Sequence, residues 1–355
     1  MVIKQCKIQK TMKKKVLYIA NMLLAGLLFA ACENGDWSFP DNDHTAVYFA
    51  YQSPIRTITL GEDANVDTSM DNDHQFQIMA TIGGVYENTQ NVVIDIRLDN
   101  SLCDGIKVKD GGDIVAMPAT HYTLSGNQIV ISNGKVLGGV TVQLTDAFFA
   151  DPLSTELNYV IPVVMTHVEG ADSILCGQPK DGVENPVRVF DTDWSIAPKD
   201  YTLYAVKYIS KYQSNYLRRG VDTYTGAQTG TTVRHAAYVE KDEVLQNQFK
   251  TLGINAVQWA RPTKNVAGEN IECNLALNFD GEGKCTVTSN SAGVTATGNG
   301  QFVSKGDKNS WGDKDRDVLY LDYTLNYDGI TCATKDTLVV RDRGVKAEWF
   351  TVEKK

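Results

Sequence analysis

The sequence lacks the motifs that mark most enzyme classes. Its five histidines are scattered, and none belongs to an HExxH zinc motif. It contains neither a GxSxG nucleophile turn nor a glycine-rich phosphate loop. Carboxylate pairs of the glycosidase kind cannot be singled out, because a chain with 43 acidic residues brings many together by accident. We therefore predict that the protein is not an enzyme, and that it has no catalytic residue and no cofactor.

Long hydrophobic runs are also scarce, and only one is present. It covers residues 16–29 and follows the lysines at positions 13–15. A short apolar run behind lysines and before small residues is typical of a signal peptide and is too short for a transmembrane helix. We predict a signal peptide over residues 1–31, with Met12 as an alternative start of translation.

A cysteine directly follows this run. Residues 28–32 read Leu, Phe, Ala, Ala, Cys and resemble the lipobox of bacterial lipoproteins, in which the cysteine receives a diacylglycerol and becomes the new N-terminus. Phe29 departs from the commoner Leu or Val at its place. Stable anchoring requires two or more hydrophobic signals, which a multiply acylated cysteine supplies. We therefore predict lipidation of Cys32 and attachment to a membrane; the alternative is a secreted protein with a chance cysteine.

The segment behind Cys32 is acidic and contains Gly, Asn and Pro. Such a composition cannot pack, so we predict a flexible tether over residues 32–45. Acidic residues at this place resemble the surface-export signal of Bacteroidetes lipoproteins. The resemblance implies a location at the outer membrane, exposed on the cell surface.

Basic residues are few in the rest of the chain. Removing residues 1–31 removes six lysines and no acidic residue, which leaves 28 basic and 43 acidic residues and a net charge of −15. Nucleic acid and anionic lipid bind to basic surfaces, so we expect neither as a partner. Solubility alone is a sufficient reason for this acidity.

The cysteines lack the spacing of a metal site. Apart from Cys6 and Cys32 there are five, an odd number, and none lies in a CxxC pair. A hairpin that turns at residues 281–283 puts Cys285 opposite Phe279, which leaves Cys273 about 20 Å away along the strand. We therefore expect free, buried thiols at Cys103, Cys176, Cys273, Cys285 and Cys332.

Two acidic loops are candidates for calcium, which prefers oxygen ligands. They contain Asp67, Asp71 and Asp73, and Asp313, Asp315 and Asp317. The second run resembles the start of an EF-hand loop, but Val318 stands where that loop needs Gly and no Glu follows at the closing position. We interpret both as solvated loops and expect no metal.

Alternation with a period of two dominates the first half of the chain. Residues 92–99 and 140–145 alternate between apolar and polar, whereas residues 159–165 are apolar on both faces, as in a central strand. Pro162 moves that strand toward a sheet edge or a bulge. Turn signals rich in Gly, Asn and Ser separate the runs. We predict an antiparallel β-sandwich over residues 46–188.

A segment with prolines and acidic residues follows, and we place a linker at residues 189–198. A second β-rich region begins at Tyr201. Its later strands are predicted at residues 233–239, 254–260, 271–279, 284–289, 294–303, 318–325, 337–341 and 347–352. This number of antiparallel strands is enough for an up-and-down β-barrel over residues 199–355.

Two groups of residues resemble a known family. Tyr122–Gly126 and Tyr159–Val163, with the strands between them, resemble the immunoglobulin-like domain that heads many surface lipoproteins of gut Bacteroidetes. Lys199–Tyr208, Tyr216–Gly220 and Asp336–Val345 are similar to the C-terminal module that accompanies it. The resemblance covers nearly all of residues 40–355. It implies an all-β chain, with an immunoglobulin-like β-sandwich followed by an antiparallel lipocalin-like β-barrel.

Members of that family typically accompany outer-membrane glycan importers. The resemblance therefore implies a polysaccharide or oligosaccharide ligand and importer proteins as partners, or a role in adhesion. It brings no motif of binding residues with it.

Aromatic side chains are the most useful signal for a sugar site, because sugar rings stack on flat aromatic faces. Tyrosines crowd residues 201–216, and four of the five tryptophans lie in the second half of the chain. Most of these rings are expected in the core. The candidates for stacking on a glycan are Trp311, which lies in a loop-like context, and Trp259, Tyr212 and Tyr216.

Two functions fit these observations. The first is a non-catalytic glycan-binding lipoprotein of the cell surface that serves a polysaccharide uptake system. The second is a structural or adhesive surface protein that binds another protein and has no sugar site.

Overall fold

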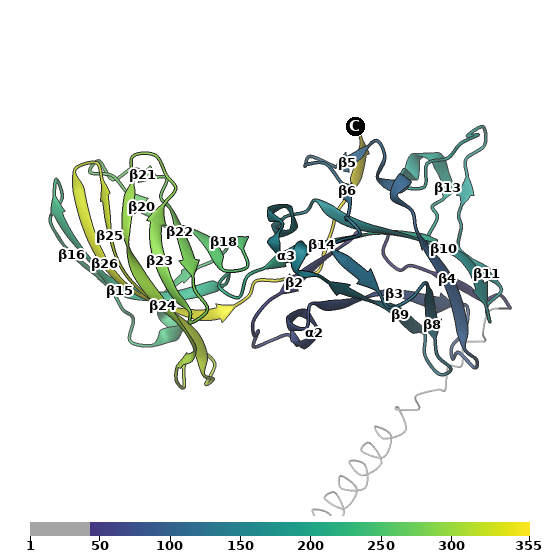
Figure 1. The fold of residues 1–355 in the computed structure, drawn as a ribbon, viewed down its shortest axis with the longest axis horizontal. Coiled ribbons are helices and arrows are strands. Elements are labelled where there is room, and N and C mark those ends of the chain that lie inside the picture. Colours follow the sequence, from purple (N-terminus) through teal and green to yellow (C-terminus); the bar gives the residue numbers. More distant parts are fainter. Residues whose placement is uncertain (1–42) are drawn as a thin grey trace, which may run out of the picture. The chain divides into compact units, whose positions relative to one another are not determined.

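A computed structural model describes residues 43–355 of the chain (Figure 1). The predicted signal peptide, Cys32 and residues 32–42 of the predicted tether lie outside the described residues. Of the tether's last residues, Thr45 is hydrogen-bonded through its backbone N–H and its hydroxyl to Asp172, at 2.7 Å each. Strands make up almost all of the regular structure, which confirms the all-β prediction.

The first lobe, drawn in purple and teal, is built from two sheets (Figure 1). The first sheet has five strands, in the order β11 (Ser173–Ile174), β1 (Ala46–Tyr48), β3 (Gln75–Gly83), β9 (Leu137–Leu144) and β7 (Tyr122–Leu124). The second has seven strands. Six lie in the order β27 (Glu348–Trp349), β2 (Pro54–Thr59), β14 (Tyr201–Ile209), β10 (Tyr159–Glu169), β4 (Val92–Leu98) and β8 (Gln128–Ile131), and the seventh, β6 (Val115–Ala116), pairs with β10.

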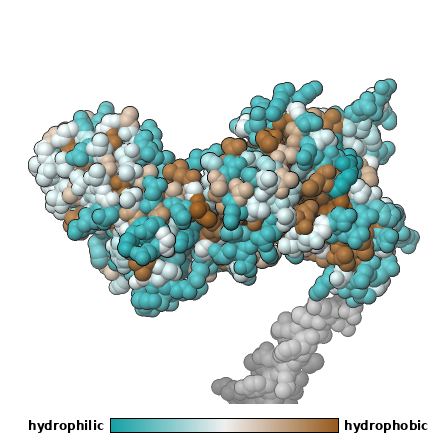
Figure 2. All heavy atoms as spheres, viewed as in Figure 1, coloured by the Kyte–Doolittle hydropathy of each residue, from teal (hydrophilic) through white to brown (hydrophobic). Residues whose placement is uncertain are grey.

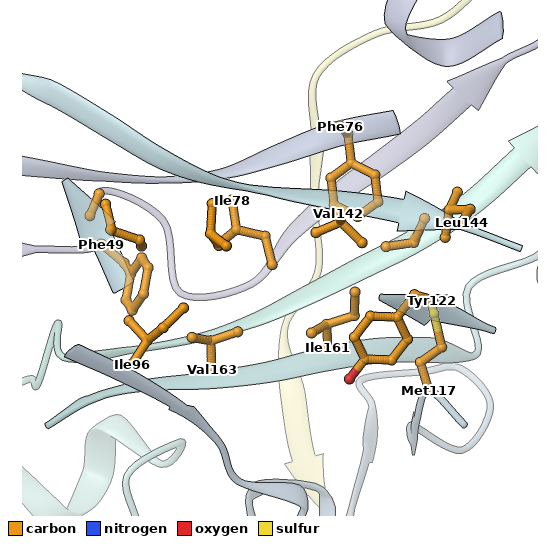
Figure 3. Close-up of a cluster of buried hydrophobic side chains, with 14 of the residues drawn as sticks. Phe49, Phe76, Ile78, Ile96, Met117, Tyr122, Val142, Leu144, Ile161 and Val163 are labelled. Carbon is orange, nitrogen blue, oxygen red and sulfur yellow. The ribbon is translucent and has the colours of Figure 1, made fainter. Parts of the chain in front are cut away.

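The main core of this lobe lies between the two sheets. The alternation predicted from the sequence sets its composition, because every second residue of β4, β3 and β9 faces inward. Figure 3 shows Phe76, Ile78 and Val142 of the first sheet meeting Ile161 and Val163 of the second, and all five are buried. Burying each such side chain contributes roughly 1.5–3 kcal/mol to stability.

Strand β10 is buried on both faces, as predicted. Its outer face carries Val160 and Val164, which belong to a second, smaller core with Leu203, Ile106 and Phe350. The expectation that Pro162 marks a sheet edge or a bulge is wrong for that residue, since it pairs with Leu203 in the middle of the sheet. Proline lacks an N–H, but no hydrogen bond of the sheet is lost at this position. Leu203 N–H donates to the carbonyl of Gln52 rather than to Pro162, and the pairing of β10 with β4 begins only at Val163.

The boundary between the lobes differs from the prediction. Strand β14 was expected to open the barrel, but it pairs with β10 and β2 and is part of the sandwich. The chain also returns at its end, since β27 pairs with β2, and β28 (Val352–Lys354) pairs with β5 (Ile106–Val108). The sandwich therefore contains residues that precede the barrel in the sequence and residues that follow it.

The second lobe, drawn in green and yellow, is one antiparallel sheet that curls around a single core (Figure 1). In sheet order its strands are β16 (Gly230–Arg234), β15 (Asn215–Gly226), β26 (Ile330–Asp342), β25 (Arg316–Tyr327), β24 (Thr295–Asp307), β23 (Lys284–Ser289), β22 (Asn274–Phe279), β19 (Ala256–Ala260) and β18 (Phe249–Gly253). Strand β17 (Glu243–Leu245) also pairs with β15. The strands from β18 to β26 follow one another as a meander, as an up-and-down barrel requires.

Short elements complete the described chain. Two further strand pairs are β12 (Gln178–Pro179) with β13 (Trp194–Ile196), and β20 (Thr263–Lys264) with β21 (Asn270–Ile271). The helices are the single turns α2 (Ser69–Asn72) and α3 (Asp146–Ala150) and the 3₁₀ turns η1 (Asn100–Cys103), η2 (Pro152–Thr155), η3 (Asp191–Asp193) and η4 (Val239–Lys241). Within residues 43–355, no helix is both long enough and apolar enough to cross a membrane.

The hairpin predicted at residues 281–283 is confirmed. Phe279 pairs with Cys285, and the five cysteines of the described chain are free. Four of them are buried, but Cys176 is exposed, so the expectation of a buried thiol is wrong at that position.

Candidate functional site

Three of the four candidate stacking residues lie in the core of the barrel. Tyr212, Tyr216 and Trp259 are fully buried. A ring without an exposed face cannot stack on a sugar, so the prediction is wrong for these three. Their rings belong to the barrel core, where they pack with other large apolar side chains such as Phe279 and Phe249.

The neighbours of these rings explain their burial. Tyr212 stacks on Phe279 with ring centres 3.6 Å apart, and Tyr216 donates from its hydroxyl to the carbonyl of Tyr212 at 2.7 Å. Trp259 is nearly parallel to Phe249, and the guanidinium carbon of Arg218 lies 5.1 Å from its ring centre. The sequence around these three residues contains no signal that separates a buried ring from an exposed one, because each stands among both apolar and polar neighbours.

Trp311 lies in the loop between β24 and β25, as expected, and it is partly exposed. Its ring is covered on part of its surface by two arginines, with the guanidinium carbons of Arg316 and Arg341 at 4.7 Å and 6.0 Å from the ring centre. It also packs on Val318 and Val339, on the outer face of the barrel. Its role as a stacking platform stays a prediction.

The same outer face carries a groove that the sequence did not single out. The groove has a volume of about 520 Å³ and crosses β23, β24, β25 and β26. We call it the outer groove. Its lining consists of Lys284, Cys285, Asn299, Gly300, Gln301, Tyr320, Leu321, Asp322, Lys335, Asp336 and Thr337.

Strand register explains how the outer groove forms. One row of cross-strand neighbours contains Lys284, Gln301, Tyr320 and Thr337. A second row, two residues further along each strand, contains Thr286, Asn299, Asp322 and Lys335. Residues two apart on a strand point to the same face and lie about 7 Å apart. The intervening residues point to the core, so the sheet backbone is the floor between two walls of side chains.

The floor of the groove contains Gly300, where the neighbouring side chains leave no room for a Cβ atom. A Cβ atom there would lie 2.5 Å from Leu321 Cδ2 and 2.8 Å from Cys285 Sγ, closer than real contacts allow. Leu321 and Cys285 therefore occupy the inward space that a side chain at position 300 would need. Only glycine permits this packing beneath the groove.

The walls of the outer groove offer an aromatic ring among polar groups. Tyr320 is 41% exposed, and its neighbours in the sheet are Gln301 and Thr337. In the second wall, Lys335 Nζ contacts Asp322 Oδ2 at 3.1 Å, while the side-chain amide of Asn299 makes no hydrogen bond to any described residue. The visible side of this lobe is mostly hydrophilic or intermediate in Figure 2. The amide nitrogen of Gln301 already donates to the carbonyls of Glu282 and Phe302, so in the described part of the chain the free polar groups near the ring are the Thr337 hydroxyl and the Asn299 amide. A flat ring near a free hydroxyl and a free amide suits a sugar better than an apolar ligand.

The two acidic loops that were predicted to be solvated differ in the burial of their aspartates. Asp71 is buried rather than solvated: it pairs with Arg56 and accepts a hydrogen bond from Thr59 N–H at 2.9 Å. Burial raises the pKa of Asp71, against the effect of these two partners. In the second loop, Asp315 pairs with Lys308, and Asp317 accepts from Lys305 N–H. Across residues 43–355, no group of three His, Cys, Asp or Glu is placed to hold a metal ion.

Comparison with known proteins places the chain. Residues 211–344 match a domain of unknown function, DUF5627, and residues 40–172 match the model of an N-terminal domain. A solved structure of unknown function from Bacteroides ovatus is 47% identical, covers 89% of this chain and 100% of its own, and has a TM-score of 0.81. The chain belongs to this two-domain Bacteroides family.

Other solved structures are far more distant from this family member. A second Bacteroides ovatus protein of unknown function is 10% identical, with 86% of this chain and 100% of that one covered and a TM-score of 0.36. A third, described as a proposed carbohydrate-binding protein, is 12% identical, with 87% and 97% covered and a TM-score of 0.27. No curated protein matches the chain.

The two family models that match this chain leave residues 173–210 unmatched. The first ends at residue 172 and the second begins at residue 211, so β14 belongs to neither. The start of the second at residue 211 agrees with the strand pairing, which ends the sandwich strand at Ile209.

Tyr320 is the residue of this family member's groove that sequence reasoning missed, although a signal for it was present. The strand predicted at residues 318–325 alternates, and its inward positions are Leu319, Leu321 and Tyr323. Tyr320 consequently shares its face with Asp322. An aromatic residue on the polar face of an alternating strand is the pattern that would have identified it.

Proposed function

We propose that this protein is a non-catalytic glycan-binding lipoprotein of the cell surface, and that a polysaccharide chain binds in the outer groove. The observation that carries the proposal is the ring of Tyr320, 41% exposed, which stands in one polar wall of the groove and faces the second polar wall. Sugars stack their C–H faces on such rings, and flanking amides and hydroxyls take the sugar hydroxyls.

The direction of the outer groove supports a chain-like ligand. Because the groove crosses four strands, its walls extend for about 14 Å, three strand spacings of about 4.8 Å each. That length exceeds a single sugar ring, and the groove is open to the surface along it. An oligosaccharide segment fits this shape better than a free monosaccharide.

The remaining parts of the proposal rest on the sequence. Lipid on Cys32 would hold the protein at the outer membrane, and the acidic tether would let it face outward. Importer proteins of a polysaccharide uptake system would then receive the captured chain. A variant with Cys32→Ala that still incorporated labelled fatty acid would contradict the anchor.

The binding test uses residues 43–355 and a panel of plant and host polysaccharides and oligosaccharides. We expect at least one glycan to bind, and Tyr320→Ala to weaken its affinity about tenfold, the loss of about 1.4 kcal/mol of stacking energy. Tyr238→Ala is the matched control, because Tyr238 is 73% exposed in the same lobe and does not line the groove. The Tyr238→Ala protein should bind the glycan with the same affinity as the unchanged protein.

Two results would contradict the proposal. If Tyr320→Ala binds the glycan as tightly as the unchanged protein, the outer groove is not the site. If no glycan in the panel binds and a protein partner is recovered instead, the adhesive function replaces it.

A further inference from the structure

A second pocket lies at the polar end of the barrel interior, on the other face of the sheet from the outer groove. It has a volume of about 320 Å³ and is lined mainly by β15, β16, β17 and the β20–β21 hairpin. This volume is at the low end for small-molecule sites, which range from about 300 to 1,000 Å³, and suits one sugar-sized ligand. We call it the inner pocket.

Buried charges form the wall of the inner pocket. Arg218 donates from Nε and Nη2 to the two oxygens of Asp336, at 3.0 and 2.9 Å. Arg234 pairs with Asp222 through both terminal nitrogens and with Asp336 at 2.9 Å. Arg261 donates to Asp222 at 3.1 Å. Three guanidinium groups thus face two buried carboxylates, which leaves one positive charge in excess.

The excess charge is balanced only loosely. The third carboxylate, Glu243, is 38% exposed and lies 3.5 Å from Arg218 Nη1 and 3.8 Å from Arg234 Nε. The Nε atom of Arg234 is buried and has no hydrogen-bond partner among the described residues. An unsatisfied buried donor costs about 1–3 kcal/mol, and a buried charge is stable only when it is well paired. Glu243 meets neither requirement, so Arg218 Nη1 and Arg234 Nε are the two donors that a better-placed oxyanion would take over from it.

The arginines are also held rigidly from behind. Arg218 lies against the ring of Trp259, and Arg261 lies 5.7 Å from the ring centre of Tyr323 and donates to its hydroxyl at 2.7 Å. Because the other nitrogens of Arg218 and Arg234 are held by Asp336 and Asp222, a ligand carboxylate would accept one directed hydrogen bond from each guanidinium, at little entropic cost. The geometry is therefore organised before a ligand arrives.

The rest of the lining suits hydroxyl groups. The side-chain amides of Gln228 and Asn270 line the inner pocket and make no hydrogen bond within residues 43–355. Tyr224, whose hydroxyl donates to Asp222 at 3.1 Å, supplies an aromatic wall. A simple anion would leave these groups unused, whereas a ring that carries both a carboxylate and hydroxyls would use them.

We propose that the inner pocket binds a sugar acid, with the ligand carboxylate placed between Arg218 and Arg234, and that Glu243 is the internal carboxylate it displaces. The site is separate from the outer groove and does not depend on the function proposed for it. Once Glu243 is displaced, the three arginines face only two carboxylates, and this local excess of positive charge in a chain of net charge −9 selects the anionic members among sugars.

The test measures binding of sodium D-glucuronate, D-glucose and sodium acetate to residues 43–355 by calorimetry or ligand-detected NMR. We expect glucuronate to bind at least tenfold more tightly than either of the others. Glu243→Gln keeps the shape of the side chain but removes the competing charge, so the affinity for glucuronate should rise about threefold. A purely structural role of Glu243 would give no gain.

Arginine variants provide the second measurement. Arg234→Gln should lower the affinity for glucuronate at least tenfold. Arg219→Gln is the matched control, because Arg219 is on the same strand but pairs with Asp242 and does not line the inner pocket. It should bind glucuronate unchanged. Thermal unfolding of each variant shows whether it is folded, and Glu243→Gln, at an exposed position, decides the matter if Arg234→Gln does not fold.

The proposal is overturned by any of three results. Equal binding of glucose and glucuronate would make the site one for neutral sugars. Equal binding of acetate and glucuronate would make it an anion site without sugar recognition. A folded Glu243→Gln protein with unchanged or weaker affinity for glucuronate would show that Glu243 does not occupy the place of the ligand.

Discussion

The fold alters the ionisation of several charged residues that it buries. Asp222 illustrates this: burial alone would raise the pKa of its carboxyl, but the hydrogen bond from Arg234 and the charge of Arg261 outweigh burial and lower it to about 2. A carboxyl whose folded pKa lies below the ordinary 3.8 stabilises the folded state above about pH 4. That stability is lost as the pH falls from about 4 to about 2.

The expected consequence is acid sensitivity of the barrel. The shift in the pKa of Asp222 corresponds to about 2 kcal/mol of stability at neutral pH. Asp222→Asn leaves the buried Arg261 without its carboxylate and Arg234 with Asp336 alone, which should lower the free energy of unfolding by about 3–5 kcal/mol at pH 7. Urea denaturation at pH 7, 5 and 3 measures both effects. Asp322→Asn is the control, because its exposed pair with Lys335 contributes less than about 1 kcal/mol.

The thiols give a second prediction for single residues. Burial raises the pKa of Cys285 to about 12 and that of Cys103 to about 11, so both stay protonated at pH 8. Of the five cysteines in residues 43–355, only Cys176 is exposed. One equivalent of thiol should therefore react rapidly with a disulfide reagent, and the other four only after denaturation. Cys176→Ser should abolish the rapid phase; rapid reaction of further thiols would contradict the burial of the others.

Sequence reasoning at this scale identified chemistry but not exposure. Trp259 was a stacking candidate because it is a large flat ring, and its near neighbour Arg261 lines the inner pocket. What the sequence does not contain is the direction of the ring, which turns toward Phe249 and the core. Direction follows from strand register across the sheet, and register involves residues far away in the chain.

Whole elements were predicted best where apolar and polar residues alternate. Strands at residues 92–98 and 284–289 were expected within a residue of where they lie, because a period of two fixes both the face and the length. Strand β15 was missed as an element. Its inward positions include Arg218 and Asp222, so the face that meets the interior is polar and the alternation is absent. The charged residues of β15 that line the inner pocket are thus the reason that β15 was not predicted as a strand.

The boundary error at β14 has a similar cause. Residues 201–209 are apolar on both faces, which indicates a central strand but not the sheet to which it belongs. Its partners are β10, about 40 residues earlier, and β2, about 150 residues earlier. No local pattern decides between such partners.

The floor of the outer groove gives the prediction at the scale of elements. Gly300→Ala places a Cβ within 2.5 Å of Leu321 Cδ2 and of the Tyr320 carbonyl oxygen. Moving β24 away from its neighbours should lower the free energy of unfolding by about 1–3 kcal/mol and weaken glycan binding, because the two walls shift. Gly281→Ala is the control, since nothing lies within 4 Å of an added Cβ there. Thermal unfolding and the glycan assay check both, and equal melting temperatures for the two variants would contradict the packing argument.

The whole molecule is organised by the return of its C-terminal segment. Phe350 is buried against the outer core of the sandwich, although it follows the entire barrel in the sequence. Phe350→Ala should therefore lower the free energy of unfolding of the sandwich by about 3 kcal/mol. Trp349→Ala, at a neighbouring residue that is 54% exposed, should cost less than about 1 kcal/mol. Hydrogen exchange at β2 and β5 locates the effect, and faster exchange confined to the barrel would contradict it.

This return has a mechanical consequence. The segments that enter and leave the barrel lie together, since Arg343 donates to the carbonyl oxygens of Ser210 and Lys211 at 2.6 and 3.1 Å. A pull on the barrel is therefore carried by two covalent segments in parallel rather than by one linker in series. On one side the load reaches β14, whose ladder bonds lie across the direction of a pull along the strand and must break together. A single proteolytic cut in either segment leaves the other to hold the load.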